Sequence, residues 1–151
     1  MVRTRVKYQE ETVYARMKFK ISDQALNELN RELNRMVSQR ACEKCIGKDN
    51  SNALELVNNC CSSQDTFIHS HMPAMEAIFR IIITNGNKPT TISYIYETLQ
   101  DRWVDPNNMW LPTPAKLYRM LTNDMYYGIR EVIRNRTKKH QVTTETTISL
   151  N

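Results

Sequence analysis

Apolar and polar residues alternate strictly along one stretch near the N-terminus, from Thr12 to Ile21. Every second residue there is apolar, and the positions between hold tyrosine, arginine and lysine. A period of two predicts a β-strand that buries one face and leaves the other in water. Ser22 then stands in the position of a helix N-cap, with Asp23 and Gln24 in the first turn. The sequence therefore predicts a strand that leads directly into a helix.

The helix after Ser22 carries an apolar stripe at alternating spacings of three and four residues. The stripe consists of Leu26, Leu29, Leu33 and Met36. Asparagine, glutamate and arginine occupy the other faces, so one side of the helix is apolar and the rest is polar. Such a side packs against the remainder of the same chain or against the same helix of a second copy, and both alternatives stay open here.

The middle of the chain predicts a polar loop, a short helix and a longer helix. Residues 46–52 form the loop, and Ala53 to Cys60 form the short helix. The longer helix opens at or near Pro73 and is rich in isoleucine. The turn at residues 85–87 stops it, and Pro89 prevents the helix from resuming.

Two further helices follow, and their ends carry clear signals. Either Thr90 or Thr91 caps the first of them. Thr113 is the expected N-cap of the second, and Pro114 stands in its first turn, where proline is favoured. Gly128 is the expected stop of that second helix.

The residues beyond Gly128 predict a β-hairpin with a basic tip. Residues 132–136 and 142–150 are rich in threonine and β-branched residues, and they flank the segment Thr-Lys-Lys-His at 137–140. Three helices followed by a basic hairpin is the order of a winged helix-turn-helix. We therefore expect a mainly α fold with a small β component. A winged helix-turn-helix over residues 73–151 would follow a strand–helix segment over residues 1–72 that serves dimerisation or docking.

Charge adds a possible ligand to this outline. The formal net charge is +5, and basic residues gather towards both ends of the chain while the middle is nearly neutral. A basic balance favours association with polyanions without specifying which one. The two basic ends form one face that follows a phosphate backbone, or they are simply solvated charge.

The winged-helix interpretation assigns these charges to a nucleic acid. Its third helix is narrow enough to enter the major groove of DNA, where exposed polar side chains meet base edges. The candidates on that helix are Lys116, Arg119 and Asn123. The hairpin would place cations over the adjacent backbone, which adds salt-sensitive affinity. The candidates there are Arg134, Arg136, Lys138, Lys139 and His140.

A family resemblance points the same way. Residues 110–121 read Trp-Leu-Pro-Thr-Pro-Ala-Lys-Leu-Tyr-Arg-Met-Leu. This segment resembles the recognition helix of PadR-type winged-helix regulators, which show a tryptophan, a Ser/Thr-Pro pair, then Leu-Tyr and a further leucine. Residues 92–99 are similar to the preceding helix of that family. The resemblance covers residues 74–150, about half of the chain, and implies DNA binding as a dimer and transcriptional repression.

Four cysteines form a second candidate site. Cys42 and Cys45 make a C-x-x-C pair, and the adjacent Cys60 and Cys61 follow after fourteen residues. Zinc takes four nitrogen or sulfur ligands in a tetrahedron, so the first pair is a good half-site. The second pair is irregular, because adjacent cysteines rarely both reach one metal ion. The other two ligands would come from Cys60, Cys61, His69 and His71. Structural zinc, plain reduced thiols and a redox or iron–sulfur sensing centre are the alternatives.

Other classes of protein lack support. The sequence has no glycine-rich phosphate loop, no His-Glu-x-x-His segment and no serine in a nucleophile elbow, so we do not expect an enzyme. Its most apolar stretch, Ala77 to Thr84, is too short to span a bilayer, and no signal peptide is visible. The sequence thus predicts a cytoplasmic DNA-binding protein, a transcriptional repressor in particular. The alternative is a protein-interaction adaptor or subunit of a larger assembly, and RNA remains an open partner.

Overall fold

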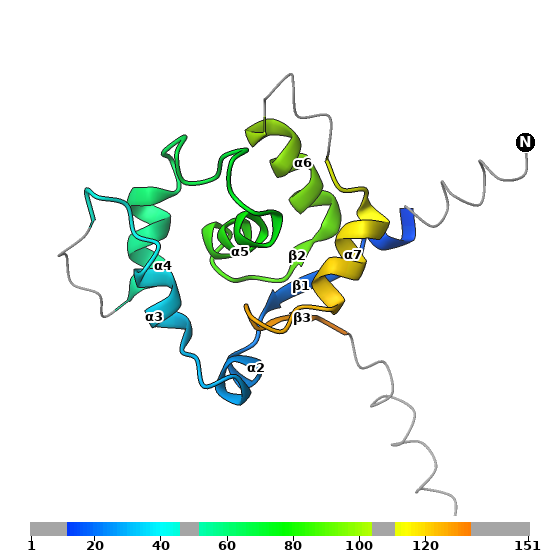
Figure 1. Cartoon of the computed structure of the whole chain (residues 1–151), viewed down its shortest axis with the longest axis horizontal. Coiled ribbons are helices and arrows are strands. Elements are labelled where there is room, and N and C mark those ends of the chain that lie inside the picture. The colour runs from blue at the N-terminus through cyan, green and yellow to red at the C-terminus, as the bar shows by residue number, and fades with distance from the viewer. Residues whose placement is uncertain (1–11, 46–51, 104–110, 134–151) are drawn as a thin grey trace, which may run out of the picture.

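The computed structural model describes residues 12–45, 52–103 and 111–133 (Figure 1). Its elements in chain order are β1 (Lys18–Ile21), α2 (Asp23–Glu28), α3 (Leu33–Ser38), α4 (Ala53–Leu56), η1 (Val57–Cys61), α5 (Ala74–Thr84), β2 (Thr90–Thr91), α6 (Ile92–Arg102), α7 (Pro114–Thr122) and β3 (Ile129–Glu131). The element η1 is a π-helix, and the other helices are α-helices. The expectation of a mainly helical chain with a small β component is therefore confirmed.

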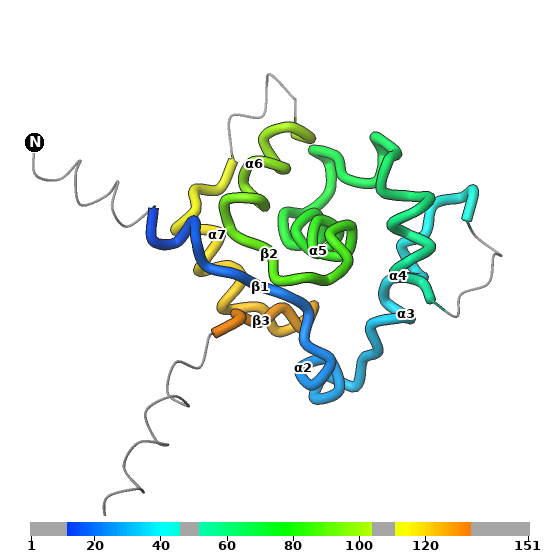
Figure 2. The backbone as a smooth tube through the Cα atoms, turned by 180° about the vertical axis from the view of Figure 1, so that it is seen from behind, coloured from blue at the N-terminus to red at the C-terminus, as the bar shows by residue number. Residues whose placement is uncertain are grey.

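The strand nearest the N-terminus lies in the centre of the sheet. The sheet has three antiparallel strands in the order β2-β1-β3, and Figure 2 shows β1 running between the other two. Phe19 lies opposite Thr90 on one side and opposite Glu131 on the other. A strand from the first part of the chain thus joins two strands that come much later.

Helix α5 forms the centre of the molecule. Its fully buried residues are Ala77, Ile78, Phe79, Ile81, Ile82 and Ile83. A helix that is apolar on most of its circumference has to be enclosed by other elements. Figure 1 shows α5 almost end-on, with α3 and α4 on one side and α6 and α7 on the other, and Figure 2 agrees from behind. Phe19 and Ile21 of β1 belong to the same core.

The predicted helix starts are confirmed. The Ser22 hydroxyl accepts a hydrogen bond from the backbone N–H of Ala25 at the start of α2. Thr91 caps α6 and Thr113 caps α7 in the same way. Pro73 immediately precedes α5, and the turn at residues 85–87 ends that helix. Each cap satisfies a backbone N–H group that has no partner within its helix.

The predicted strand is shorter than the alternating pattern suggested. Residues 12–15 are helical, and the strand begins only at Lys18. Backbone hydrogen bonds from Arg16 to Val13 and from Met17 to Tyr14 turn the chain there. The ring of Tyr14 packs on that of Tyr118, with centroids 4.8 Å apart, which holds this turn against α7.

The helix expected after Ser22 is divided into α2 and α3. Asn30 has a φ of 55°, in the left-handed region that asparagine tolerates better than most residues. Arg31 donates its backbone N–H to the carbonyl of Leu26 at 2.9 Å, which closes the end of α2. Leu26 and Met36 both enter the core of the chain, so the continuous stripe that would have formed a dimer seam is not present.

The prediction that the third helix ends at Gly128 was also wrong. Helix α7 ends at Thr122, six residues before Gly128, with Asn123 as its C-cap. Gly128 has a φ of 72°, and a Cβ atom there would lie 2.7 Å from the side chain of Leu26. Its carbonyl accepts a hydrogen bond from Ser22 at 2.8 Å. Glycine is therefore needed where the chain passes close to the start of α2.

The predicted hairpin lies outside the described residues, except for Val132 and Ile133. Within the described ranges β3 pairs with β1, and Val132 extends this pairing by donating to the carbonyl of Lys18 at 2.8 Å. The boundary predicted between residues 72 and 73 runs between elements that share one sheet, because β1 precedes it and both β2 and β3 follow it.

Candidate metal centre and predicted nucleic-acid residues

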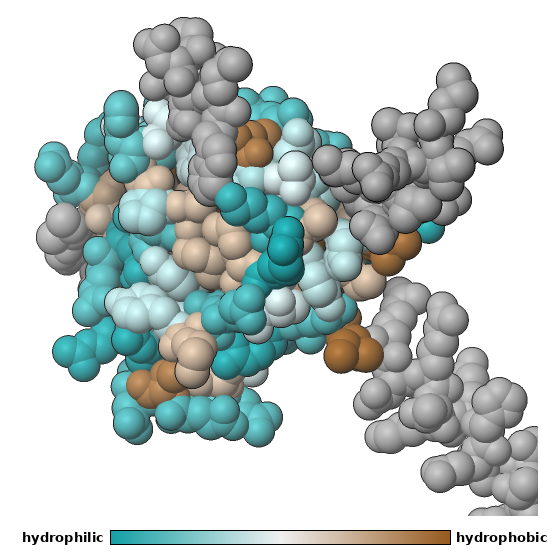
Figure 3. Space-filling model, turned by 45° about the vertical axis from the view of Figure 1, so that its right-hand side comes forward, coloured by the Kyte–Doolittle hydropathy of each residue, from teal (hydrophilic) through white to brown (hydrophobic). Residues whose placement is uncertain are grey.

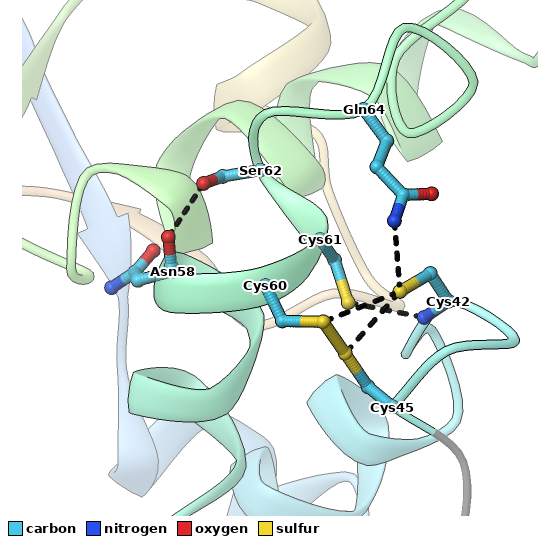
Figure 4. Close-up of a disulfide and its surroundings, with 7 residues drawn as sticks. All are labelled: Cys42, Cys45, Asn58, Cys60, Cys61, Ser62 and Gln64. Atoms are coloured by element: carbon cyan, nitrogen blue, oxygen red, sulfur yellow. Dashed lines mark hydrogen bonds between the residues drawn. A yellow bond between two sulfur atoms is a disulfide. The ribbon is translucent and has the colours of Figure 1, made fainter.

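The four cysteines come from two short segments on the same side of α5 (Figure 4). Cys42 and Cys45 lie in a turn beyond α3, which is closed by the Cys45 N–H donating to the Cys42 carbonyl at 2.9 Å. Cys60 and Cys61 are the last residues of η1. The expectation that the C-x-x-C pair and the adjacent pair meet is confirmed, because the four Sγ atoms all lie within 4.8 Å of one another.

Two of the sulfur–sulfur distances in the cluster are near those of a tetrahedral metal site, and a third pair is bonded. The Cys42 sulfur lies 3.3 Å from that of Cys45 and 3.7 Å from that of Cys60. With zinc–sulfur bonds of about 2.3 Å, the sulfurs of a tetrahedral site stand about 3.8 Å apart. Cys45 and Cys60 are joined as a disulfide, and Cys42 and Cys61 are free thiols. The cluster therefore has an oxidised form, and in its reduced form it offers four thiolates to a metal.

The π-helical turn explains why adjacent cysteines both reach the cluster. The Ser62 N–H donates to the carbonyl of Val57 at 3.0 Å, which is a bond across five residues rather than the usual four. A wider turn separates neighbouring side chains by a smaller angle around the helix axis. Cys60 and Cys61 thus point to the same side, so the adjacent pair, irregular as it is in the sequence, brings both sulfurs to the cluster.

Polar groups surround the sulfurs and favour a negative charge on Cys42. The backbone N–H of Cys42 donates to the Sγ atom of Cys61 at 3.1 Å. The Gln64 amide donates to the Sγ atom of Cys42 at 3.4 Å. The hydrogen bond between the Cys42 and Cys61 side chains lowers the pKa of Cys42, whereas burial raises the pKa of Cys61. Donors of this kind are typical partners of metal-bound thiolates.

The two histidines that were candidate ligands are not part of the cluster. Among the described residues, the group of possible ligands contains the four cysteines alone. His69 instead accepts a hydrogen bond at Nδ1 from the backbone N–H of His71, at 3.2 Å. The second half of the centre is thus the adjacent cysteine pair and not a histidine pair.

A half-buried carboxylate next to the centre connects three parts of the chain. Both oxygens of Glu76 in α5 accept from Arg40, at 2.6 and 3.0 Å, and Arg80 also donates to it at 3.1 Å. The Tyr127 hydroxyl donates to the same carboxylate at 2.9 Å. Burial raises the pKa of Glu76, but the hydrogen bonds and charge of Arg40 outweigh it, so the net pKa is lowered. Because Arg40 precedes Cys42 by two residues, this network fixes the turn that carries the first cysteine pair.

Only one contact of this network has a local signal in the sequence. The i,i+4 spacing of Glu76 and Arg80 on a helix indicates an ion pair. Arg40 and Tyr127 are far from Glu76 in the sequence, so their part in the network had no local signal. The same is true of Gln64, which reaches the cluster from the loop beyond η1.

The candidates on α7 lie together on the outer side of the helix. Leu117 and Leu121 are buried, whereas Arg119 and Asn123 are exposed and Lys116 is half-buried. Spacings of three and four residues place Lys116, Arg119 and Asn123 on one side of the helix. The candidates of the hairpin, Arg134, Arg136, Lys138, Lys139 and His140, lie outside the described residues.

Comparison with families of known proteins, with curated proteins and with solved structures finds no match for this chain. In the described part of the chain, no helix has both the length and the apolar character needed to cross a membrane.

Proposed function

We propose that this protein binds duplex DNA through α7, in the manner of a winged helix-turn-helix. The proposal rests on one observation, the order α5, β2, α6, α7 and β3 around a single small sheet. That order is typical of a winged helix, in which the third helix enters the major groove. Here the central place in the sheet is taken by β1.

The surface of α7 supports this role. Its buried side is held by Leu117 and Leu121, and its N-terminus is capped by Thr113, so the helix is fixed to the rest of the fold. Arg119 and Asn123 are then presented to solvent on one side. Arginine pairs with guanine and asparagine with adenine in the major groove, so these side chains suit base contacts. Lys116 lies on the same side of the helix and completes this groove-facing set, and the basic residues at 134–140 would contact phosphates.

The resemblance to PadR-type regulators extends the proposal to repression of transcription by a dimer. In this view the chain binds two half-sites as a pair of copies, because a two-fold symmetric protein suits a palindromic operator.

The cysteine cluster supports structural zinc as part of the same proposal. Four thiolates form a closed tetrahedral set, which is the ligand type that zinc prefers in structural sites. Zinc would tie the turn after α3 to the end of η1. Metal analysis of the reduced protein should find one zinc ion per chain. Cys61→Ser should lose it, and Ser63→Ala, an exposed neighbour, should retain it. Four reactive thiols without metal would instead indicate plain cysteines, and two would indicate the disulfide form.

The test of DNA binding is fluorescence anisotropy with a random duplex across a range of salt concentrations. A phosphate binder loses affinity steeply as salt rises. Reversing charge with Arg119→Glu together with Lys139→Glu should lower affinity sharply. The matched control for the change in charge carries Arg35→Glu on α3 and Arg102→Glu at the end of α6. Unchanged affinity in the first double variant contradicts the assignment of these residues.

A protein-interaction adaptor is the second candidate, and exposed apolar side chains favour it. Met125 is 80% exposed and Tyr126 is 47% exposed, directly after α7. Figure 3 shows hydrophobic residues on one face only as small separate patches among hydrophilic ones, which limits the area that such an interface can bury. Absence of DNA binding at low salt would favour this candidate.

A further inference from the structure

The outward face of the sheet carries only positive charge among its described residues. Phe19 and Ile21 of β1 are buried, so the alternate residues Lys18 and Lys20 lie on the opposite face, and both are exposed. Arg130 is the outward residue of β3, between the buried Ile129 and the half-buried Glu131. The outward residue of β2 is a threonine. No carboxylate therefore faces outward from these strands.

Two of these cations lie directly opposite each other. The register pairs Lys20 with Arg130, and directly paired residues of antiparallel strands share one face. Like charges in this position destabilise a sheet. Lys18 and Lys20 form no ion pair with any described residue. Of this pair only Arg130 has an acidic partner, Asp124 at 3.8 Å, so Lys18 and Lys20 are left without a counter-charge among the described residues, which suits an external anion.

Arg130 is held in place while part of its guanidinium stays available. Its Nη1 atom donates to the carbonyls of Asp124 and Ile129, at 3.1 and 2.8 Å. The Asp124 carboxylate lies 3.8 Å from Nη1, and it already accepts from the backbone N–H groups of Tyr126, Tyr127 and Ile129. The arginine is therefore oriented by Nη1, and no described residue hydrogen bonds to its Nε or Nη2.

The spacing of the three charges suits a polymer of phosphates better than one small anion. Lys18 and Lys20 lie two residues apart on a strand, so their Cα atoms are about 6.7 Å apart. Arg130 adds a third charge on the neighbouring strand, about 5 Å from Lys20. Long side chains at these separations can spread over successive phosphates of one strand, so that each cation neutralises a charge of its own.

We propose that this face, formed by Lys18, Lys20 and Arg130, binds the phosphate backbone of duplex DNA. It rests on the proposed DNA binding and adds a second contact region to α7. In a usual winged helix the chain beyond the third helix supplies the cations that follow the backbone. Here β1 occupies the central place in the sheet, so the charges of the N-terminal segment join those of β3 on one surface.

The test is the salt dependence of duplex DNA binding by the full chain carrying Lys18→Gln and Lys20→Gln. Each phosphate contact contributes about 0.9 to the slope of log affinity against log salt concentration. The double variant should therefore lower the slope by about 2 and weaken binding about tenfold at low salt. The control carries Arg35→Gln and Arg102→Gln. Neither cation belongs to the sheet, because Arg35 lies in α3 and Arg102 is the last residue of α6. Its slope should stay within about 0.3 of the unmodified protein.

The outcomes separate this inference from the proposed function. An unchanged slope in the Lys18 and Lys20 variant, with the thermal midpoint preserved, overturns the sheet-face contact even if Arg119→Glu abolishes binding. A reduced slope in that variant, with no effect of Arg119→Glu, supports the sheet face and refutes the role of α7. If the unmodified protein binds no duplex at low salt, both proposals fail.

Discussion

Glu76→Gln is the substitution that the structure makes most informative. The Glu76 carboxylate accepts four hydrogen bonds, two from Arg40 and one each from Arg80 and Tyr127. Its side chain is 16% exposed, and those of Arg40 and Arg80 are 11% and 21% exposed. Glutamine has almost the same shape, but it carries no charge and retains only one accepting oxygen. The variant therefore leaves two shielded guanidinium groups without their counter-charge.

The size of the effect follows from this burial. Removing one partner of a fully buried ion pair costs about 3–5 kcal/mol, and an exposed pair contributes at most about 1 kcal/mol. The Glu76 network is mostly but not fully buried, so we expect a loss of about 3 kcal/mol in the free energy of unfolding. For a chain of this length that lowers the thermal midpoint by about 6–12 °C.

The assay is urea unfolding followed by circular dichroism, repeated over a range of pH. The pKa of Glu76 is lowered in the fold, so its contribution is fully present above the pKa of the unfolded carboxyl. It is lost as the pH falls through the lower pKa of the folded state, and the difference between Glu76→Gln and the unmodified protein should shrink there. A loss below about 1 kcal/mol at neutral pH would refute the reasoning, because the network would then behave as a solvated surface pair.

Further substitutions test the other features. Gly128→Ala should destabilise the protein by about 2 kcal/mol or more, measured by thermal unfolding, because it combines a positive φ with a contact of 2.7 Å to Leu26. Thr91→Ala should cost about 1 kcal/mol through loss of the α6 cap, and Thr91→Ser should restore most of it. Burial, together with the nearby Glu76, raises the pKa of Tyr127 to about 12. The stability advantage of the unmodified protein over Tyr127→Phe should hold below pH 10 and vanish as the pH rises through about 12, where a constant difference would contradict this assignment.

Local signals in the sequence predicted the helix starts well. Ser22, Thr91 and Thr113 cap their helices through their own side chains, and Pro73 stands where α5 begins. These features depend on a few neighbouring residues, because a cap needs only a side-chain oxygen within reach of the next turn. The composition of α5, which is rich in isoleucine, is likewise typical of a buried helix.

Features that depend on distant residues could not be predicted from the local sequence in the same way. The alternation that ends at Ile21 indicated a strand, but nothing near it indicates that β1 pairs with both β2 and β3. The expected helix is interrupted at Asn30, and the two short helices each place a residue in the core, Leu26 from α2 and Met36 from α3, an arrangement that depends on the surrounding elements. Gly128 looked like a helix stop, yet its role is set by Leu26, a residue about one hundred positions earlier.

The candidate site shows the same division. The C-x-x-C pair was evident from its spacing, whereas the participation of both Cys60 and Cys61 required the π-helical turn of η1. Such a turn is defined by one hydrogen bond across five residues, and no residue preference identifies it in the sequence. His69 and His71 have suitable chemistry for zinc, and only the fold shows that they lie apart from the sulfurs.

The positions of the two proposed sites determine how metal loss would affect DNA binding. The cysteines join the turn after α3 to η1, on one side of α5, and the sheet and α7 lie on the other (Figure 1). No cysteine belongs to α7 or to the strands, so zinc bound at the proposed centre would have no direct contact with the proposed DNA surface. Both surfaces nevertheless depend on α5, whose buried isoleucines pack within one core. Loss of zinc would therefore lower DNA binding through the fraction of folded protein, while the affinity and salt slope of the molecules that remain folded stay unchanged.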